Sequence, residues 1–543
     1  MKIMSFFISL VLLTNSFVAQ DIKSIKTIAE LSNYESTSTY NDVIHFISIL
    51  KKQSNLVQIE NIATTVEGHE IPLVIIADPM PKNLNKIKLD PRIKVYIQGN
   101  IHAGEVEGKE ALLMFARDIL NGNKELLKDV ILLLCPIFNA DGNEPISPKN
   151  RTNQNGPKNG VGIRYNGQNL DLNRDAMKLE SPEVQGLVKN VLNKYDPAVF
   201  LDCHTTNGSY HEEPVTFVWQ MNCNGDTSLI SYMRDKMMPD VSSTLSKKYN
   251  TLNCFYGEFI DQRDYSKGWI SYAFEPRYIV NYVGLRNRLA ILNENYVYAD
   301  FKSRVIGCYN LLWSVVEYSA QNKKEIISLI STADERTISK GMNPGAQDSF
   351  AVTQKALPLK EPITVNAYKV EKYTDQNGRE RLRKTDVKKP VTIPFFANYI
   401  PVKSVKHPFA YILTVADPQV INLLTAHGIK VEKLSQSFTL EAESYKITEL
   451  KPSPRSNQGH YMNQVKGEFY NETKEFEKGN ILIRTAQPLG NLVSYLFEPE
   501  SDDGLLIWNF FDRWIVPQWG GGFLPYPVHK IINASEINSS GNL

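Results

Sequence analysis

Apolar runs alternate with polar, helix-forming segments along residues 22–340. One such segment, residues 181–195, has Ser181 as a good N-cap and Pro182 in the first turn of the expected helix. Strand–helix alternation of this kind predicts an α/β sandwich around a largely parallel or mixed sheet. The runs expected to be strands are residues 71–78, 92–100, 129–139, 197–204 and 288–296.

The pattern changes after the polar stretch 331–349, which is typical of a linker. Beyond it, short apolar runs separated by turn residues predict strands, interrupted by one helix with Asp417 as its cap and Gly428 as its stop. We therefore expect a first domain at 21–340 and a smaller, mainly β domain at 345–543. No motif assigns an activity to the second domain.

The first 20 residues have a different pattern. They contain one early lysine, an apolar run at residues 3–13 and a small-residue end near Ala19, which predicts a secretory signal peptide. The apolar run is too short to span a bilayer comfortably. We therefore expect a secreted or periplasmic protein after cleavage, with no transmembrane segment in the mature chain.

The charge balance and the cysteine count bear on the possible binding partners and on disulfide pairing. Lys and Arg total 60 against 59 Asp and Glu, which gives no support for a nucleic-acid or anionic-membrane surface. The five cysteines are an odd number, so at least one of them is unpaired in an exported chain. A disulfide between Cys223 and Cys254 is possible, but nothing in the sequence establishes it.

Candidate metal ligands stand at the ends of two of the expected strands. His102 and Glu105 follow the run 92–100, and His204 ends the run 197–204. An isolated H-x-x-E is a weak signal, and a lone histidine is more often a satisfied core residue. Functional groups gather at the carboxyl ends of strands in open α/β sheets, however, and two imidazoles with one carboxylate suit zinc with a place left for water.

A Gly- and Asn-rich segment between these ligands carries further candidate chemistry. It contains Arg151, Arg164 and Arg174, together with Asp171 and Asn173. A guanidinium beside an Asn amide can clamp a carboxylate, and a second guanidinium can polarise a carbonyl. A solvated polar loop with incidental charges is the competing interpretation.

Five short motifs together resemble a known family. "NIHAGEVEGKEA", "FNADG", the "NR" at Asn150–Arg151, "LDLNRD" and "FLDCH" occur in the order and approximate spacing of the zinc carboxypeptidases, the carboxypeptidase A-like metallopeptidases. The resemblance covers about residues 95–300, and the rest fits exported bacterial members with an added C-terminal β domain. It implies a carboxypeptidase-like fold, in which helices flank a mixed central sheet.

The resemblance assigns the zinc site residue by residue. It implies that His102, Glu105 and His204 hold one Zn²⁺ per chain. Asp171 matches the carboxylate that orients the first zinc histidine, a role that suits the usual need of a ligating imidazole for an acceptor on its other nitrogen.

The resemblance also implies the groups that bind the substrate. Asn173 and Arg174 match the pair that holds the terminal carboxylate of the substrate. Arg151 matches the arginine that polarises the scissile carbonyl, and Arg164 is the runner-up for one of the arginine roles.

The remaining roles have less support in the motifs. Glu294 ends an expected core strand and is the favoured general base, with Glu275 as the alternative. Tyr282 is chosen as the tyrosine that closes over substrate, and Arg286 as a residue of the same pocket. A packed aromatic and a surface charge are the competing interpretations of the last two.

These residues predict a metallocarboxypeptidase that hydrolyses the C-terminal amide bond of peptides with a free terminal carboxylate. A zinc-activated water attacks, Glu294 transfers protons and Arg151 stabilises the oxyanion. The alternatives are a zinc amidase acting on peptidoglycan stem peptides or N-acyl amino acids, and a catalytically inactive peptide-binding relative.

Overall fold

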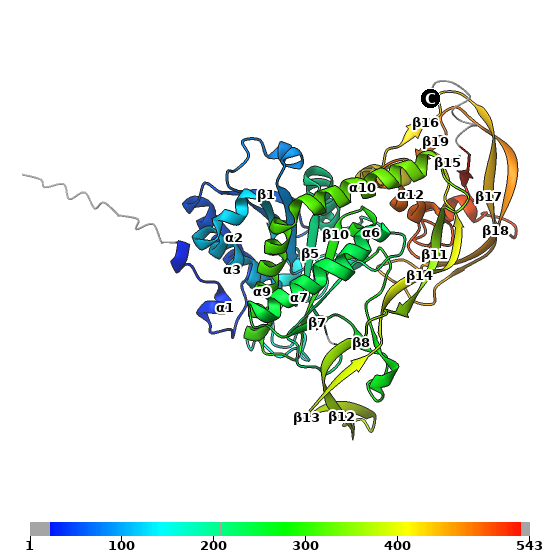
Figure 1. Ribbon diagram of the computed structural model, residues 1–543. Helices are drawn as coiled ribbons and strands as arrows, with labels where there is room; N and C mark the ends of the chain where they lie inside the picture. Colours follow the sequence, from blue (N-terminus) through cyan, green and yellow to red (C-terminus); the bar gives the residue numbers. More distant parts are fainter. Residues whose placement is uncertain (1–21, 207, 534–543) are drawn as a thin grey trace, which may run out of the picture.

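The computed structural model describes residues 22–206 and 208–533. The predicted signal peptide at 1–20 lies outside these ranges. Figure 1 shows a first part built around a central sheet, a β-rich part at the opposite end, and a β hairpin that projects from the region between them.

The first part is organised by an eight-stranded mixed sheet in the order β1-β2-β4-β3-β5-β10-β6-β7. The four central strands β4, β3, β5 and β10 run parallel, while β1, β2 and β6 make antiparallel pairs. Strands β4 and β5 are buried along their whole length, as expected for parallel strands covered on both faces. The strands are β1 (Val57–Thr64), β2 (Glu70–Ile76), β3 (Ile93–Gly99), β4 (Val130–Cys135), β5 (Val199–Thr206), β6 (Val215–Trp219), β7 (Asn253–Phe255) and β10 (Leu289–Tyr296).

Helices flank this sheet, so the predicted α/β fold with a mixed central sheet is confirmed. The helix expected at 181–195 begins at Pro182 with Ser181 as its cap, and continues as a π-helix over Leu187–Asn193. The long helices α3 and α9 pack together beside the sheet. The α-helices of this part are α1 (Ile28–Leu31), α2 (Tyr40–Gln53), α3 (Glu107–Gly122), α4 (Ala140–Asn143), α5 (Pro182–Gly186), α6 (Thr227–Tyr232), α7 (Met238–Lys247), α8 (Ile279–Leu285), α9 (Phe301–Gln321) and α10 (Lys323–Met342).

The expected linker at 331–349 is wrong over most of its length. Helix α10 continues to Met342 and extends toward the C-terminal β-rich part, where it packs against α12 (Gly490–Phe497). Ala333, Thr337 and Gly341 are buried at the three- to four-residue spacing of one helix face. Tertiary packing of these small residues therefore makes a polar stretch helical.

The C-terminal part is β-rich, as predicted, but the expectation of a single helix is wrong, because α12 and a short helix at Asp512–Ile515 occur in addition to the expected one. Its six-stranded sheet has the order β16-β19-β15-β20-β17-β18. Helix α11 (Pro418–His427) begins after the predicted cap Asp417 and ends at Gly428, whose φ of 88° is the left-handed conformation that glycine favours. The sheet consists of β15 (Ala410–Leu413), β16 (Glu432–Lys433), β17 (Phe438–Pro452), β18 (Asn463–Phe476), β19 (Ile481–Arg484) and β20 (Val528–Ile531), and α13 (Asp512–Ile515) precedes its last strand.

Two further β elements connect the two parts of the chain. A four-stranded sheet, β11-β14-β9-β8, combines β8 (Glu258–Phe259) and β9 (Trp269–Ile270) with β11 (Ser349–Pro358) and β14 (Phe395–Lys406). The projecting hairpin is formed by β12 (Ile363–Thr374) and β13 (Glu380–Ile393). Because β9 of the first part pairs with β14 of the second, the two parts share a sheet. The domain boundary between 340 and 345 stays a prediction.

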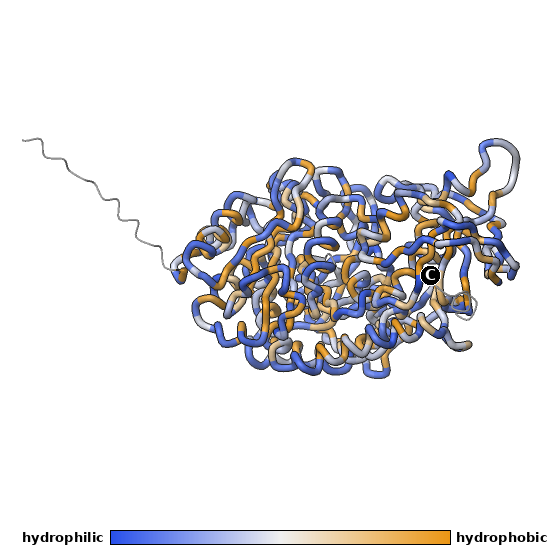
Figure 2. The backbone as a smooth tube through the Cα atoms, turned by 90° about the horizontal axis from the view of Figure 1, so that it is seen from above, coloured by the Kyte–Doolittle hydropathy of each residue, from blue (hydrophilic) through white to orange (hydrophobic). Residues whose placement is uncertain are grey.

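Hydrophobic stretches run through the interior of the chain trace in both parts, and hydrophilic segments occupy most outer loops (Figure 2). All five cysteines are free, so the open Cys223–Cys254 bridge is not formed. In the described ranges, no helix is both long and apolar enough to cross a membrane.

Candidate active site

The three predicted metal ligands come together at the carboxyl edge of the central sheet. His102 follows β3, Glu105 precedes α3 and His204 lies near the end of β5. Because β3 and β5 are parallel neighbours, their carboxyl ends deliver these side chains to one place. His102 Nδ1 lies 3.1 Å from Glu105 Oε1, and His204 Nδ1 lies 3.1 Å from Glu105 Oε2 and 3.2 Å from His102 Nδ1. All three side chains are buried.

Each histidine is oriented by a carboxylate on its far nitrogen. His102 Nε2 donates to Asp171 Oδ1 at 3.0 Å, and His204 Nε2 donates to Asp202 Oδ2 at 2.8 Å. When the proton sits on this far nitrogen, the Nδ1 atom on the side of Glu105 is left free to bind a metal ion. The donor set of two imidazole nitrogens and one carboxylate fits zinc.

Asp202 was missed by the sequence reasoning. The signal that could have found it is its spacing, since residues two apart on a strand share a face and Asp202 precedes His204 by two.

Electrostatic interactions favour the charged forms at this centre. Burial raises the pKa of Glu105, but His102 and Arg151 more than offset it and hold that pKa well below its usual value. Burial likewise opposes protonation of His204, while Asp202 raises the pKa of that imidazole well above its usual value. Glu105 is therefore an ionised donor.

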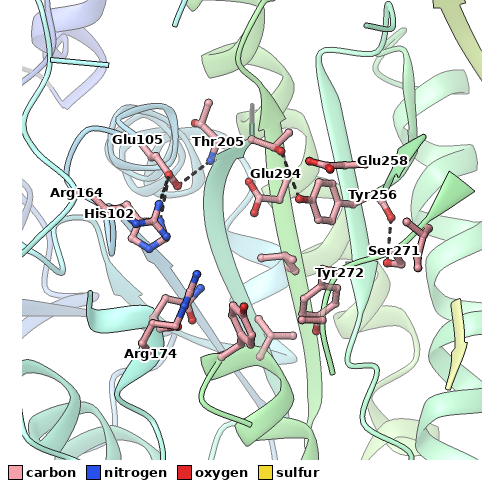
Figure 3. Close-up of a pocket in the computed structure, with 18 of the residues that line it drawn as sticks. His102, Glu105, Arg164, Arg174, Thr205, Tyr256, Glu258, Ser271, Tyr272 and Glu294 are labelled. Carbon is pink, nitrogen blue, oxygen red and sulfur yellow. Dashed lines mark hydrogen bonds and ion pairs between the residues drawn. The ribbon is translucent and has the colours of Figure 1, made fainter. Parts of the chain in front are cut away.

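Three arginines surround the ligands and line one cavity of about 380 Å³. Arg151 Nη1 lies 3.0 Å from Glu105 Oε1, and its Nη2 donates to the Thr205 carbonyl at 3.2 Å. Arg164 donates from Nε to Asp171 Oδ2 at 2.9 Å. Arg174 packs its guanidinium over the Tyr278 ring, 4.3 Å from the ring centre. Figure 3 shows Arg164 and Arg174 on the same side of the cavity as His102.

Asn173 lines the same cavity, so the structure brings it together with Arg174. Its Oδ1 accepts a hydrogen bond from the Ile279 N–H at 2.9 Å, and its Nδ2 lies 3.5 Å from His204 Nε2. The first of these bonds ties the segment of Asn173 to the start of helix α8.

Glu294 also reaches the cavity, because β10 lies beside β5 and pairs Glu294 with His204 in register. Figure 3 shows it beside Glu105 and His102. Burial raises the pKa of Glu294 to about 8, against the lowering effect of His204. Glu275 does not line this cavity, and Arg277 Nη2 lies 3.8 Å from its Oε1. The geometry therefore favours Glu294 over Glu275 as the base.

Tyr282 and Arg286, predicted for the substrate pocket, lie outside it. Tyr282 is fully buried in helix α8, where its hydroxyl and His427 Nδ1 are 2.8 Å apart. Arg286 donates to the Tyr282 hydroxyl at 3.1 Å and to the His427 carbonyl at 2.9 Å. Both predictions are corrected: these side chains fasten α8 to the end of α11 and do not contact the cavity.

Other tyrosines line the cavity instead, namely Tyr256, Tyr272 and Tyr278. The Tyr256 hydroxyl lies 3.4 Å from Thr206 Oγ1, and Figure 3 shows its ring beside Glu294. The chain has 26 tyrosines, and no periodicity or motif separates these three from the others.

The C-terminal part also contacts this site. Gln458, in the loop between β17 and β18, accepts a hydrogen bond from the Asp171 N–H at 2.7 Å. Two residues on, His460 Nε2 lies 2.7 Å from Glu180 Oε1. The Gln458–Asp171 contact joins residues 287 positions apart, so no local sequence signal could have found it.

Comparison with known proteins supports the motif-based resemblance. Residues 44–208 match the family model described as zinc carboxypeptidase. The chain is similar to "Carboxypeptidase 2" of Trichophyton rubrum, with 22% identity over 459 residues that cover 81% of this chain and 77% of the relative. It is 30% identical to mouse (Mus musculus) "Carboxypeptidase Z" over 153 residues, which cover 26% of this chain and 22% of that protein.

The solved structures to which part of this chain is similar include two bacterial metallo-carboxypeptidases. That of Burkholderia cenocepacia is 16% identical with a TM-score of 0.38, covering 52% of this chain and 67% of its own. That of Pseudomonas aeruginosa, solved in complex with (2-guanidinoethylmercapto)succinic acid, is 18% identical with a TM-score of 0.37, covering 53% of this chain and 69% of its own. On the family match, residues 44–208 are a zinc carboxypeptidase domain, which together with the curated carboxypeptidase relatives supports a metal-dependent peptide hydrolase.

Proposed function

We propose that the chain is an exported carboxypeptidase with one catalytic zinc ion, which removes the C-terminal residue of peptides. The observation that supports this proposal most is that candidate metal ligands, arginine guanidinium groups and a candidate carboxylate base all line one cavity. His102, Glu105 and Glu294 line it together with Arg151 and the Asn173–Arg174 pair. The predicted signal peptide at 1–20 supports export.

His102, Glu105 and His204 are the residues that would hold the ion, with Asp171 and Asp202 fixing the two imidazoles. When bound, zinc supplies Lewis acidity toward a water and toward the scissile carbonyl. The two imidazoles and Glu105 together bring one negative charge, so a divalent ion keeps net positive charge at the centre.

The protein side chains would do the rest of the work. In its ionised form, which the positive charge of a bound ion would favour, Glu294 takes the proton of the attacking water and passes it to the leaving amine. Arg151, held against Glu105 and the Thr205 carbonyl, faces the charge that develops on the carbonyl oxygen. Arg174 and Asn173 bind the carboxylate of the residue to be released.

Arg174 is available to bind the substrate carboxylate because its guanidinium makes few contacts within the protein. Its Nη1 donates to the Asn173 carbonyl at 2.8 Å, and its nearest carboxylate oxygen, on Asp171, is 3.9 Å away. A guanidinium on a tyrosine face, with no close carboxylate of its own, is suited to take an anionic group from the substrate.

The test compares peptides that differ only at the C-terminus. We expect stepwise loss of C-terminal residues from a peptide with a free carboxylate, and no cleavage of its amidated twin. Arg174→Ala should raise KM for the free peptide at least tenfold, whereas Arg336→Ala, a surface arginine paired with Asp226, should not. Equal cleavage of the amidated peptide would contradict the exopeptidase assignment.

A further inference from the structure

A second group of metal-capable side chains lies apart from the candidate active site. His211, Glu213 and Cys254 each offer one ligand atom, and these atoms lie within 4.8 Å of one another. His211 and Glu213 belong to the connection between β5 and β6, and Cys254 lies on β7. The group shares no residue with the set formed by His102, Glu105 and His204.

The polar atoms of this group are buried and poorly satisfied. His211, Glu213 and Cys254 are only 2%, 1% and 7% exposed. His211 Nδ1 and Glu213 Oε2 lie 3.2 Å apart, close enough for a charge interaction. Neither atom, however, has an aligned hydrogen-bond partner within the described part of the chain. Buried polar atoms without a partner are rare because each costs about 1–3 kcal/mol.

Surrounding residues hold the two polar side chains in place. The other oxygen of Glu213, Oε1, accepts hydrogen bonds from the backbone and side-chain amides of Asn366 at 2.9 and 2.8 Å. The His211 ring stacks on Tyr296, with 3.9 Å between ring centres, and meets the Trp269 ring edge-on at 5.9 Å. Outer contacts of this kind orient the ligands of a metal before it binds.

One ligand of the group, Cys254, lies at the wall of a second cavity. Cys254 lines a cavity of about 750 Å³ between β7 and the segment 358–364. An ion can therefore reach the thiol from this cavity without passing through the candidate active site, whose cavity has a separate lining.

We propose that His211, Glu213 and Cys254 form a second metal site, which takes a divalent transition-metal ion of intermediate softness such as Zn²⁺. A nitrogen, a carboxylate oxygen and a sulfur are a poor set for Mg²⁺ or Ca²⁺, which prefer oxygen ligands only. The Cys254 thiol binds as the thiolate, so its proton is released to solvent when the ion enters.

The site is structural in this proposal. Asn366 belongs to β12, so the ion joins the β5–β6 connection and β7 to the base of the projecting hairpin. An ion at this position stabilises the folded chain by an amount that depends on its concentration relative to the dissociation constant. Removal of the ion should therefore lower the melting temperature.

Cobalt distinguishes the two sites by their ligands. The full mature chain is stripped with chelator and reloaded with Co²⁺. It should then bind two cobalt ions per chain and show a near-ultraviolet thiolate-to-cobalt charge-transfer band. The first site holds nitrogen and oxygen donors only, so this band reports Cys254 alone. We expect Cys254→Ser to abolish the band and to reduce cobalt from two ions per chain to one. His211→Gln should weaken or abolish it, and Cys223→Ser, a half-buried cysteine outside the group, should leave it unchanged.

The result against the proposal is equally distinct. One cobalt per chain in the wild type, with no charge-transfer band, would show that His211 and Glu213 form an ion pair without a metal. A band that survives Cys254→Ser, or that disappears in Cys223→Ser, would also overturn the assignment. His204→Ala separates this question from the proposed function, since it should remove one cobalt ion while the thiolate band remains.

Discussion

Gln458 allows a test of whether the C-terminal part acts on the candidate active site. Its side-chain oxygen accepts the Asp171 N–H at 2.7 Å, and Asp171 in turn accepts from His102 and Arg164. Asp171 is only 4% exposed, so Gln458→Ala would leave a nearly buried N–H without this partner. Such a loss costs about 1–3 kcal/mol. If the loss of this hydrogen bond lets Asp171 move, His102 is no longer held in the orientation that binds zinc. Zinc affinity and kcat/KM should then each fall about five- to a hundredfold.

Backbone strain has to be separated from the lost acceptor. Gln458 has a φ of 54°, in the left-handed region that favours glycine. Gln458→Gly removes the same acceptor while relieving that conformation, so it should lose zinc affinity as Gln458→Ala does but keep more stability. Gln464→Ala, on exposed β18, is the matched control and should change nothing.

The measurement is chelator competition for zinc, with kcat/KM and the melting temperature recorded on the same samples. Unchanged zinc affinity and kcat/KM in Gln458→Ala, with only a lower melting temperature, would contradict a role for Gln458 in positioning Asp171. Gln458 would then fasten the β17–β18 loop without positioning Asp171.

Three further outcomes follow from the structure. Glu294→Gln should lower kcat by about 10²- to 10⁴-fold while zinc content by elemental analysis is unchanged, and full activity in this variant would remove Glu294 from the mechanism. Tyr282→Phe should keep kcat and KM but lower the melting temperature, because its hydroxyl contacts His427 and Arg286 and not the cavity; a tenfold loss of kcat would restore it to the site. Burial lowers the pKa of His427 to about 3. Below pH 6.5, the ordinary pKa of histidine, the unfolded chain therefore binds a proton at His427 that the folded chain does not bind. The free energy of unfolding then falls by about 1.4 kcal/mol for each pH unit until the pH reaches the folded-state pKa. His427→Gln should flatten the dependence of unfolding free energy on pH between 6 and 4, and an unaltered slope would contradict this.

The clustering of the three candidate metal ligands could be predicted from the sequence because the signals of these residues are local. His102, Glu105 and His204 stand at strand ends, and parallel strands bring such ends together by geometry alone. Glu294 reaches the same place because it lies near the carboxyl end of β10, the strand that pairs with β5.

The misplaced residues depended on packing that the sequence pattern does not encode. Tyr282 and Arg286 lie on a short helix whose orientation is set by contact with His427, far along the chain. The helical part of the expected linker likewise depends on burial of Ala333 and Gly341 against other elements. Gln458 reaches Asp171 only because the β17–β18 loop folds back onto the first part of the chain.

We propose above that His102, Glu105 and His204 hold the zinc ion of a carboxypeptidase. The most direct test strips the mature chain with chelator, adds zinc back stepwise and measures release of the C-terminal residue from a free peptide. We expect the stripped protein to be inactive, activity to return with zinc in the wild type, and no activity to return in folded His204→Ala. Full activity in the stripped protein, or in His204→Ala, would contradict it.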